Sequence, residues 1–221
     1  MPKVSVIIPV YGAESFIERC ARSLFEQTLE DMEFIFVDDC SPDRSVEILN
    51  KVVSEYPNRN VSVWKQSINC GVSAVRELAL SKATGEYLGF CDSDDWVDPN
   101  MYKTLVETAE AQDADVVGCG FWEHSIAGIT ERTFLHRNDS REVILSPFFF
   151  GGIYGALWNK LIKKDFFDFA SQDLWNVFPE AKRYIMHYHP WNFILKIRAM
   201  LVSFLPSIIG VQLLKLKKST K

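Results

Sequence analysis

Residues 85–96 read GEYLGFCDSDDW, a short apolar run that leads directly into three carboxylates, Asp92, Asp94 and Asp95. The run predicts a buried strand over Tyr87–Cys91 whose carboxyl end is acidic. Neighbouring carboxylates repel one another, so a cation would stabilise them. Mg²⁺ and Mn²⁺ prefer oxygen ligands and leave coordination positions for phosphates. Asp92 and Asp94 are therefore candidate metal ligands beside a diphosphate; the alternative is an acidic turn that caps a helix beginning near Asn100.

Strand and helix patterns alternate along the chain before and after this stretch. Helical spacing of Phe16, Ile17, Cys20 and Leu24 predicts an amphipathic helix over Glu14–Glu26, and Ser41-Pro42-Asp43 predicts an N-cap and a helix start. Gly71 permits a tight turn before a helix that ends near Lys82. The predicted strands are Val4–Val10, Glu33–Val37, Val61–Trp64, Tyr87–Cys91 and Ala114–Cys119, with a helix over Asn100–Gln112.

The sequence after Gly120 gives weaker signals. Glu123–Arg132 could form a polar hairpin, and Val143–Leu145 a short strand or a helical turn. Residues 148–160 are rich in aromatic residues and glycine, which suits a pocket wall that closes over a ligand. The alternative is a loop that covers the edge of the core.

The alternation predicts an α/β fold with a mostly parallel central sheet flanked by helices. Ligands of such sheets bind beyond the carboxyl ends of the strands. Tyr11, Asp39, Asn69 and the 92–95 cluster each follow a predicted strand, so we expect them to meet in one crevice. Each also has a structural alternative, with Tyr11 at a core edge, Asp39 as a helix cap and Asn69 as a turn residue.

Composition is that of a globular protein of 221 residues. Its five cysteines are scattered, without the spacing of a zinc or redox pair, which predicts reduced thiols in a cytoplasmic protein. No secretory signal is expected, because residues 4–8 are too short an apolar segment.

Residues 182–221 carry a net charge of +8 and the rest of the chain −13, which together give −5. Apolar residues recur between Trp191 and Leu216, but the uncharged run is short for a membrane span and contains Pro206. This pattern predicts a basic amphipathic helical tail on an anionic surface, at the inner face of the membrane. The alternative is packing on the domain or on a second subunit. No nucleic-acid recognition motif accompanies the charge.

Taken together, five segments resemble family 2 of the nucleotide-sugar glycosyltransferases, which have the A-type fold. They lie within about the first 165 residues, in the family's order, and read VSVIIPVY (4–11), EFIFVDDCS (33–41), NCGVSAVR (69–76), GEYLGFCDSDDW (85–96) and WNK (158–160). The resemblance implies a nucleotide-diphospho-sugar transferase (Rossmann-like) fold over residues 1–181. Residues 1–119 would bind the nucleotide-sugar, residues 120–181 would form a reduced acceptor half, and residues 182–221 would be the tail.

The resemblance also implies roles for single residues. Tyr11 would stack on a uracil ring, and Asp39 would accept the N–H of that base. Asp94, together with Asp92, would hold Mn²⁺ or Mg²⁺, and Arg76 would lie near the diphosphate, unless it forms a salt bridge on its own helix. The implied donor-binding set is Pro9, Tyr11, Glu14, Asp39, Asn69, Arg76, Asp92, Ser93 and Asp95.

The implied activity is inverting transfer of a sugar from a UDP-sugar to a polysaccharide or lipid-linked acceptor in cell-surface glycan biosynthesis. This reaction needs a general base, and the family normally supplies a Glu-Asp pair or a lone Asp after WNK. No Glu-Asp pair follows residues 30–31 here, and the weak candidates that remain are Asp165, Asp168, Asp173 and Glu180. The base is therefore unassigned, and the oligomeric state is open.

Two other functions compete with this interpretation. A protein that binds the nucleotide-sugar without turning it over would not need the missing base. An aspartyl-nucleophile phosphotransfer enzyme needs its Asp-x-Asp on the first strand, but that strand ends here in Pro9-Val10-Tyr11.

Overall fold

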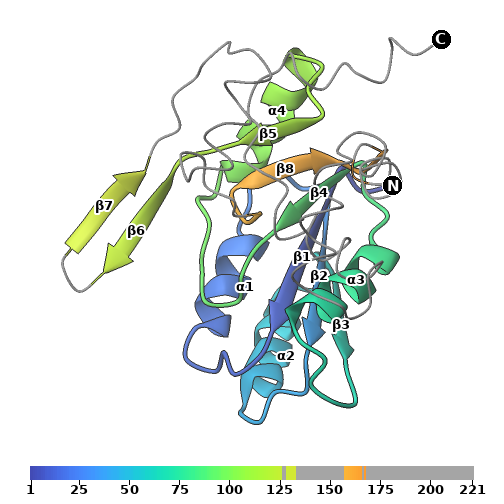
Figure 1. Ribbon diagram of the computed structural model, residues 1–221, viewed down its shortest axis with the longest axis vertical. Helices are drawn as coiled ribbons and strands as arrows, with labels where there is room; N and C mark the ends of the chain where they lie inside the picture. Colours follow the sequence, from blue (N-terminus) through green and yellow to red (C-terminus); the bar gives the residue numbers. More distant parts are fainter. Residues whose placement is uncertain (126–127, 133–156, 166, 168–221) are drawn as a thin grey trace, which may run out of the picture.

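The computed structural model of the chain describes residues 1–125, 128–132, 157–165 and 167. Its centre is a six-stranded sheet in the order β3-β2-β1-β4-β8-β5 (Figure 1). The first four strands in sequence are mutually parallel, whereas β8 runs antiparallel to both of its neighbours, so the predicted mostly parallel sheet is confirmed. The strands are β1 (Val4–Val10), β2 (Met32–Asp38), β3 (Asn60–Lys65), β4 (Tyr87–Phe90), β5 (Val116–Gly118) and β8 (Lys160–Lys163).

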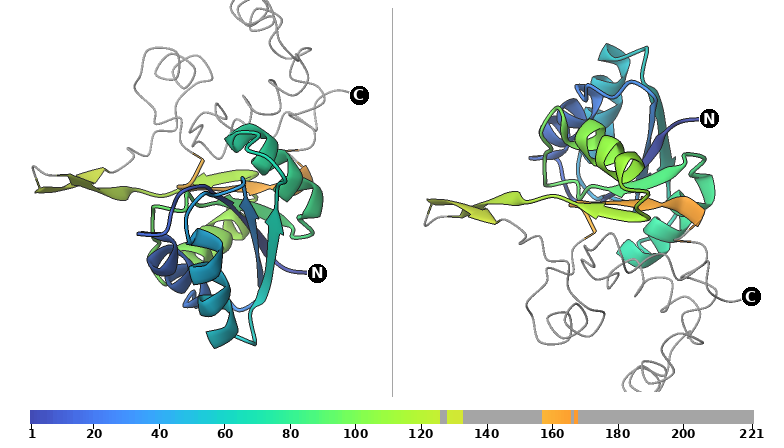
Figure 2. Two further views of the ribbon diagram at one scale, coloured as in Figure 1. Left: turned by 90° about the horizontal axis from the view of Figure 1, so that it is seen from below. Right: turned by 90° about the horizontal axis from the view of Figure 1, so that it is seen from above.

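Helices cover both faces of the sheet. One face carries α1 (Ile17–Phe25), α2 (Ser45–Glu55) and α4 (Met101–Ala111), and the other carries α3 (Val72–Lys82) (Figure 2). Residues of β1 alternate between the two sides: Val6 and Ile8 pack with the first layer, and Ile7 packs with the second. The central strand is therefore buried on both faces, as its β-branched and largely apolar sequence predicts.

The start of α2 differs from the prediction. The helix begins at Ser45 after Arg44, and Asp43 Oδ1 accepts a hydrogen bond from Ser45 N at 3.1 Å. Ser41, predicted as the N-cap, instead accepts from Gly12 N at 3.2 Å, and Ser45 Oγ accepts from Ala13 N at 2.8 Å. These serines therefore join the turn after β2 to the turn after β1, which fixes two loops at the same end of the sheet.

The strand β8 was not predicted. It pairs Ile162 with Leu88 of β4 and Leu161 with Val117 of β5, and both of its apolar side chains are buried on opposite faces of the sheet. The predicted polar hairpin is confirmed as β6 (Phe121–Ser125) and β7 (Gly128–Arg132), which extends away from the sheet (Figures 1 and 2).

Several predictions fall outside the described residues. They concern Val143–Leu145, most of the wall over residues 148–160, the boundary near residue 181 and the tail 182–221. In the part of the chain that the structure describes, no helix combines the length and apolar character needed to cross a bilayer.

Candidate functional site

A pocket of about 380 Å³ opens where β1, β2 and β4 end. From β1 the chain continues to β2 and β3 on one side, whereas β4 lies on the other side, so the strand order reverses between β1 and β4. Such a reversal is where ligands bind in open α/β sheets. The lining includes seven of the predicted donor and metal residues, Pro9, Tyr11, Asp39, Asn69, Asp92, Ser93 and Asp94.

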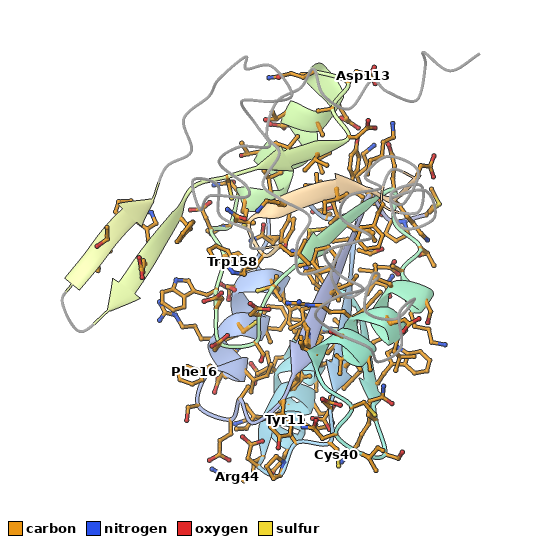
Figure 3. All side chains as sticks on the ribbon, viewed as in Figure 1. Tyr11, Phe16, Cys40, Arg44, Asp113 and Trp158 are labelled. Atoms are coloured by element: carbon orange, nitrogen blue, oxygen red, sulfur yellow. The ribbon has the colours of Figure 1, made fainter. Side chains whose placement is uncertain are left out.

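Tyr11 follows β1 directly and presents its ring to the pocket. The residue is 54% exposed and lines the pocket, so part of its side chain is open to a ligand. Figure 3 shows Tyr11 and Phe16 at the same end of the molecule, where the parallel strands end. Phe16 was predicted on the buried face of its helix, but it precedes α1, is 53% exposed and also lines the pocket. Two exposed rings thus offer flat apolar surfaces to a ligand.

Asp39 follows β2 and is buried. Its Oδ1 accepts a hydrogen bond from Cys70 N and its Oδ2 accepts one from Gly71 N, each at 2.7 Å. Gly71 has φ +83°, the left-handed conformation that glycine adopts without strain, and it immediately precedes α3. Asp39 therefore holds the turn that precedes α3, although it does not cap the first turn of that helix, which has no side-chain cap. Each carboxylate oxygen retains capacity to accept a further hydrogen bond from a ligand in the pocket.

Asp92 lies at the end of β4 and pairs with a cation from α3. Arg76 Nη2 is 3.1 Å from Asp92 Oδ1, whereas a pairing of Arg76 within its own helix had been the alternative. Burial raises the pKa of Asp92 above its ordinary value, and the neighbouring Asp94 raises it further, while the Arg76 guanidinium partly offsets both. Arg76 itself does not line the pocket, but it orients a carboxylate that does.

Asp94 and Asp95 continue the acidic loop. Asp94 is exposed at the pocket, and Asp95 lies outside the lining; burial, Asp94 and Asp92 together raise the pKa of Asp95 to about 6. The loop does not cap α4, because that helix begins at Met101 and Asp98 Oδ1 accepts from Asn100 N at 2.8 Å. Asp92 and Asp94 thus line the pocket, and no side chain of this loop caps the helix.

The carboxylates that line the pocket suit a cation that is coordinated partly by the protein and partly by a substrate. Among the described residues, no group of three or more acidic, histidine or cysteine side chains forms a closed metal cage. Asp92 and Asp94 nevertheless both face the pocket. Mg²⁺ and Mn²⁺ bind in this way, through one or two carboxylates, with the remaining positions filled by phosphate oxygens and water. The residues present therefore fit such an ion together with a diphosphate.

Glu14 and Asp165 do not line the pocket. Glu14 accepts a hydrogen bond from Arg44 N at 3.1 Å, on the loop between β2 and α2. Asp165 is exposed just after β8, and Asp168, Asp173 and Glu180 lie outside the described residues. The roles of these residues stay predictions.

Comparison with known proteins finds relatives in one protein family. Residues 5–174 match the family described as "Glycosyl transferase family 2". The Bacillus subtilis protein named "Uncharacterized glycosyltransferase EpsJ" is 43% identical over 126 residues, which cover 57% of this chain and 36% of that protein. The B. subtilis protein named "Putative glycosyltransferase EpsH" is 32% identical over 167 residues, covering 74% of this chain and 47% of that protein. The chain therefore spans less than half the length of these curated relatives.

A solved structure has the same fold. The S. aureus TarS 1-349 crystal structure in complex with UDP matches with a TM-score of 0.60 at 23% identity, over 75% of this chain and 48% of that chain. At this level of identity the likeness concerns the arrangement of strands and helices.

Proposed function

This chain belongs to glycosyl transferase family 2, and on this premise we propose that it transfers a sugar from a UDP-sugar to an acceptor, with inversion at the anomeric carbon and with a divalent metal ion. The acceptor would be a growing polysaccharide or a lipid-linked glycan of the cell surface. The reaction would take place in the cytoplasm, at the inner face of the membrane, with the predicted tail over residues 182–221 on anionic lipid.

The arrangement around Tyr11 and Asp39 supports a uridine donor. An exposed aromatic ring stacks on any base, so Tyr11 would supply affinity without selecting the base. An ionised carboxylate only accepts hydrogen bonds, so Asp39 would select a base that presents an N–H at this position, as uracil does. The backbone amides of Cys70 and Gly71 hold the Asp39 carboxylate in place before a ligand arrives. The UDP complex of TarS, a protein of the same fold, is in accord with this donor.

The acidic end of β4 would hold the metal ion and the diphosphate. Asp94 and Asp92 are the residues that would bind Mn²⁺ or Mg²⁺, and the bound ion would act as a Lewis acid toward the departing diphosphate. Arg76 pairs with Oδ1 of Asp92 and would leave the other oxygen for the metal ion. Asn69 and Ser93, which also line the pocket, would contribute hydrogen bonds to the sugar or to the ribose.

The observation that carries this proposal is the convergence of Tyr11, Asp39 and Asp94 on one pocket. Titration calorimetry with UDP and with GDP, each with and without Mn²⁺, tests it. We expect UDP to bind more tightly than GDP, and Mn²⁺ to increase UDP affinity. Asp94→Ala should reduce the Mn²⁺-dependent UDP affinity by about tenfold or more. Asp31→Ala, at the amino end of β2, is the control and should behave like the unaltered protein. Equal UDP affinity with and without Mn²⁺ would refute the proposed site.

A second candidate is a protein that binds the nucleotide-sugar without transferring it. It is favoured by the absence of a Glu-Asp pair after WNK and by the exposed position of Asp165. Release of UDP from a UDP-sugar, measured with a mixture of membrane-derived glycan acceptors, separates the two candidates. Tight, metal-dependent UDP binding without UDP release would support the second one.

A further inference from the structure

An arginine lies over an exposed tryptophan beside the pocket. Arg19 Cζ is 3.2 Å from the centre of the Trp96 ring, and Trp96 is 38% exposed. Arg19 is exposed as well. A guanidinium over an indole face is attracted by the ring and keeps the edge that carries its N–H groups free for a second partner.

This pair adjoins the pocket on two elements. Arg19 lies one helical turn after Phe16, and Trp96 comes two residues after Asp94; both Phe16 and Asp94 line the pocket. The loop that carries Trp96 is fastened along α1, because Val97 N donates to Ser23 Oγ at 3.2 Å and Gln27 Nε2 donates to Asp98 O at 2.7 Å. These hydrogen bonds hold the loop that carries Trp96 against the helix that carries Arg19, and so fix where the pair lies relative to the pocket.

Arg19 and its neighbour Arg22 on α1 differ in whether a carboxylate pairs with their positive charge. Arg22 is occupied by Glu18 at 2.9 Å and Glu55 at 2.7 Å. Arg19 has no carboxylate partner among the described residues. As far as the structure describes the pocket lining, it contains Asp39, Asp92 and Asp94 and no lysine or arginine. Arg19 thus offers an uncompensated positive charge at the rim of an acidic pocket.

We propose that Arg19 and Trp96 form a subsite for a phosphate group of the acceptor. The proposal rests on the proposed function, in which the donor diphosphate occupies the acidic end of β4. Arg19 lies outside that lining, so the anion that it would meet belongs to the second substrate. The planar guanidinium binds two phosphate oxygens in parallel, and stacking on Trp96 reduces the side-chain freedom that is lost on binding. The acceptor class is therefore a phosphate-bearing or phosphodiester-linked glycan or polyol.

The test uses glycerophosphoglycerol as the phosphodiester probe and diglycerol as its uncharged counterpart. The full chain is saturated with UDP and Mg²⁺, and the indole N–H signal of Trp96, assigned with Trp96→Phe, is followed by NMR during each titration. We expect glycerophosphoglycerol to shift this signal and diglycerol to leave it unchanged. Arg19→Gln should weaken probe binding by about tenfold or more, as expected for the loss of a charged hydrogen bond, and Arg19→Lys should retain part of the binding.

The variants of Trp96 lack the indole N–H signal, so their probe binding is measured from the phosphorus NMR signal of glycerophosphoglycerol. Trp96→Ala should weaken it by about threefold, and Trp96→Phe should weaken it less.

The matched control is Arg22→Gln, which removes the same charge from the same helix and should leave probe binding unchanged. UDP affinity, measured in parallel, should be the same in all five variants and the unaltered protein. The proposal is overturned if the probe does not bind the unaltered protein, if it binds Arg19→Gln equally well, or if Arg19→Gln weakens UDP as much as the probe. Failure of UDP itself to bind would instead refute the donor site and thus the proposed function.

Discussion

At the scale of single residues, Asp39 joins the pocket to the start of α3. Replacing it by asparagine would turn one of its two carboxylate oxygens, which accept hydrogen bonds from backbone amides, into an NH2 donor that faces Cys70 N or Gly71 N. We expect Asp39→Asn to lower the free energy of unfolding by about 1 to 3 kcal/mol, because a buried amide N–H would lose its partner. Urea denaturation measures this difference. Asp31→Asn, an exposed residue, is the control, and a change equal to that of the control would contradict the role assigned to Asp39.

The burial of Lys160 leads to a prediction about how the free energy of unfolding depends on pH. The residue is fully buried, and burial lowers its pKa from 10.5 to about 7. Between these two values the unfolded chain binds a proton that the folded protein does not, so the contribution of Lys160 to the free energy of unfolding rises with pH. The slope is about 1.4 kcal/mol per pH unit. We expect the unaltered protein to gain about 2 kcal/mol relative to Lys160→Met between about pH 7.5 and about pH 9.

The comparison with Lys160→Met isolates this lysine from its neighbours. Asn159 Oδ1 accepts a hydrogen bond from Lys160 Nζ at 2.7 Å, and the neighbouring Cys119 has a pKa raised by burial to about 11. The contribution of Cys119 to the free energy of unfolding falls with pH, opposite to that of Lys160. Because Cys119 is present in both proteins, this contribution largely cancels when the two are compared. Denaturation midpoints across the pH range provide the measurement, and parallel curves for the two proteins would show that Lys160 is charged when folded.

At the scale of secondary-structure elements, Gln27 links α1, α4 and the loop between β4 and α4. It is buried; its Nε2 donates to Asp98 O at 2.7 Å and its Oε1 accepts from Tyr102 N at 3.3 Å. Tyr102 N belongs to the first turn of α4, where backbone amides have no partner within the helix. We expect Gln27→Ala to destabilise the protein by about 1 to 3 kcal/mol, because the amide of Tyr102 would stay buried and unpaired, whereas Asp98 O keeps the hydrogen bond from Met101 N.

Thermal and urea unfolding test this expectation, with Gln112→Ala on the exposed end of α4 as the matched control. Hydrogen exchange adds a local readout, since the amide of Tyr102 should exchange faster in Gln27→Ala. A variant as stable as the control, with unchanged exchange at Tyr102, would remove Gln27 from this linking role.

Most of the elements could be predicted because their patterns are local. The apolar run of β1 and the helical spacing in α1 and α4 are visible within a window of about ten residues. The strand β8 could not be found in this way, because four residues are too few for a period and its partners Leu88 and Val117 are distant in sequence. The start of α2 was misplaced because Ser41 bonds to Gly12 on another loop, a contact that helix-start signals do not reveal.

At the scale of the whole molecule, the site could be predicted where residues follow strands. Parallel strands bring their carboxyl ends to one edge, so Tyr11, Asp39 and Asp94 meet although they are far apart in sequence. Phe16 was missed because an apolar residue at helical spacing predicts burial. Arg19 and Trp96 were missed for a related reason: an exposed arginine on a polar helix face gives no signal until its partner is placed over it.

The position of β8 between β4 and β5 sets an order of events during synthesis. Chains fold from the amino end as they leave the ribosome. Within the described residues, β5 reaches the sheet only by pairing with β8, which emerges about forty residues later. Val116–Gly118 must therefore wait for Lys160–Lys163 before they take their native place, and until then the growing polypeptide leaves one side of β4 open to the first strand that arrives.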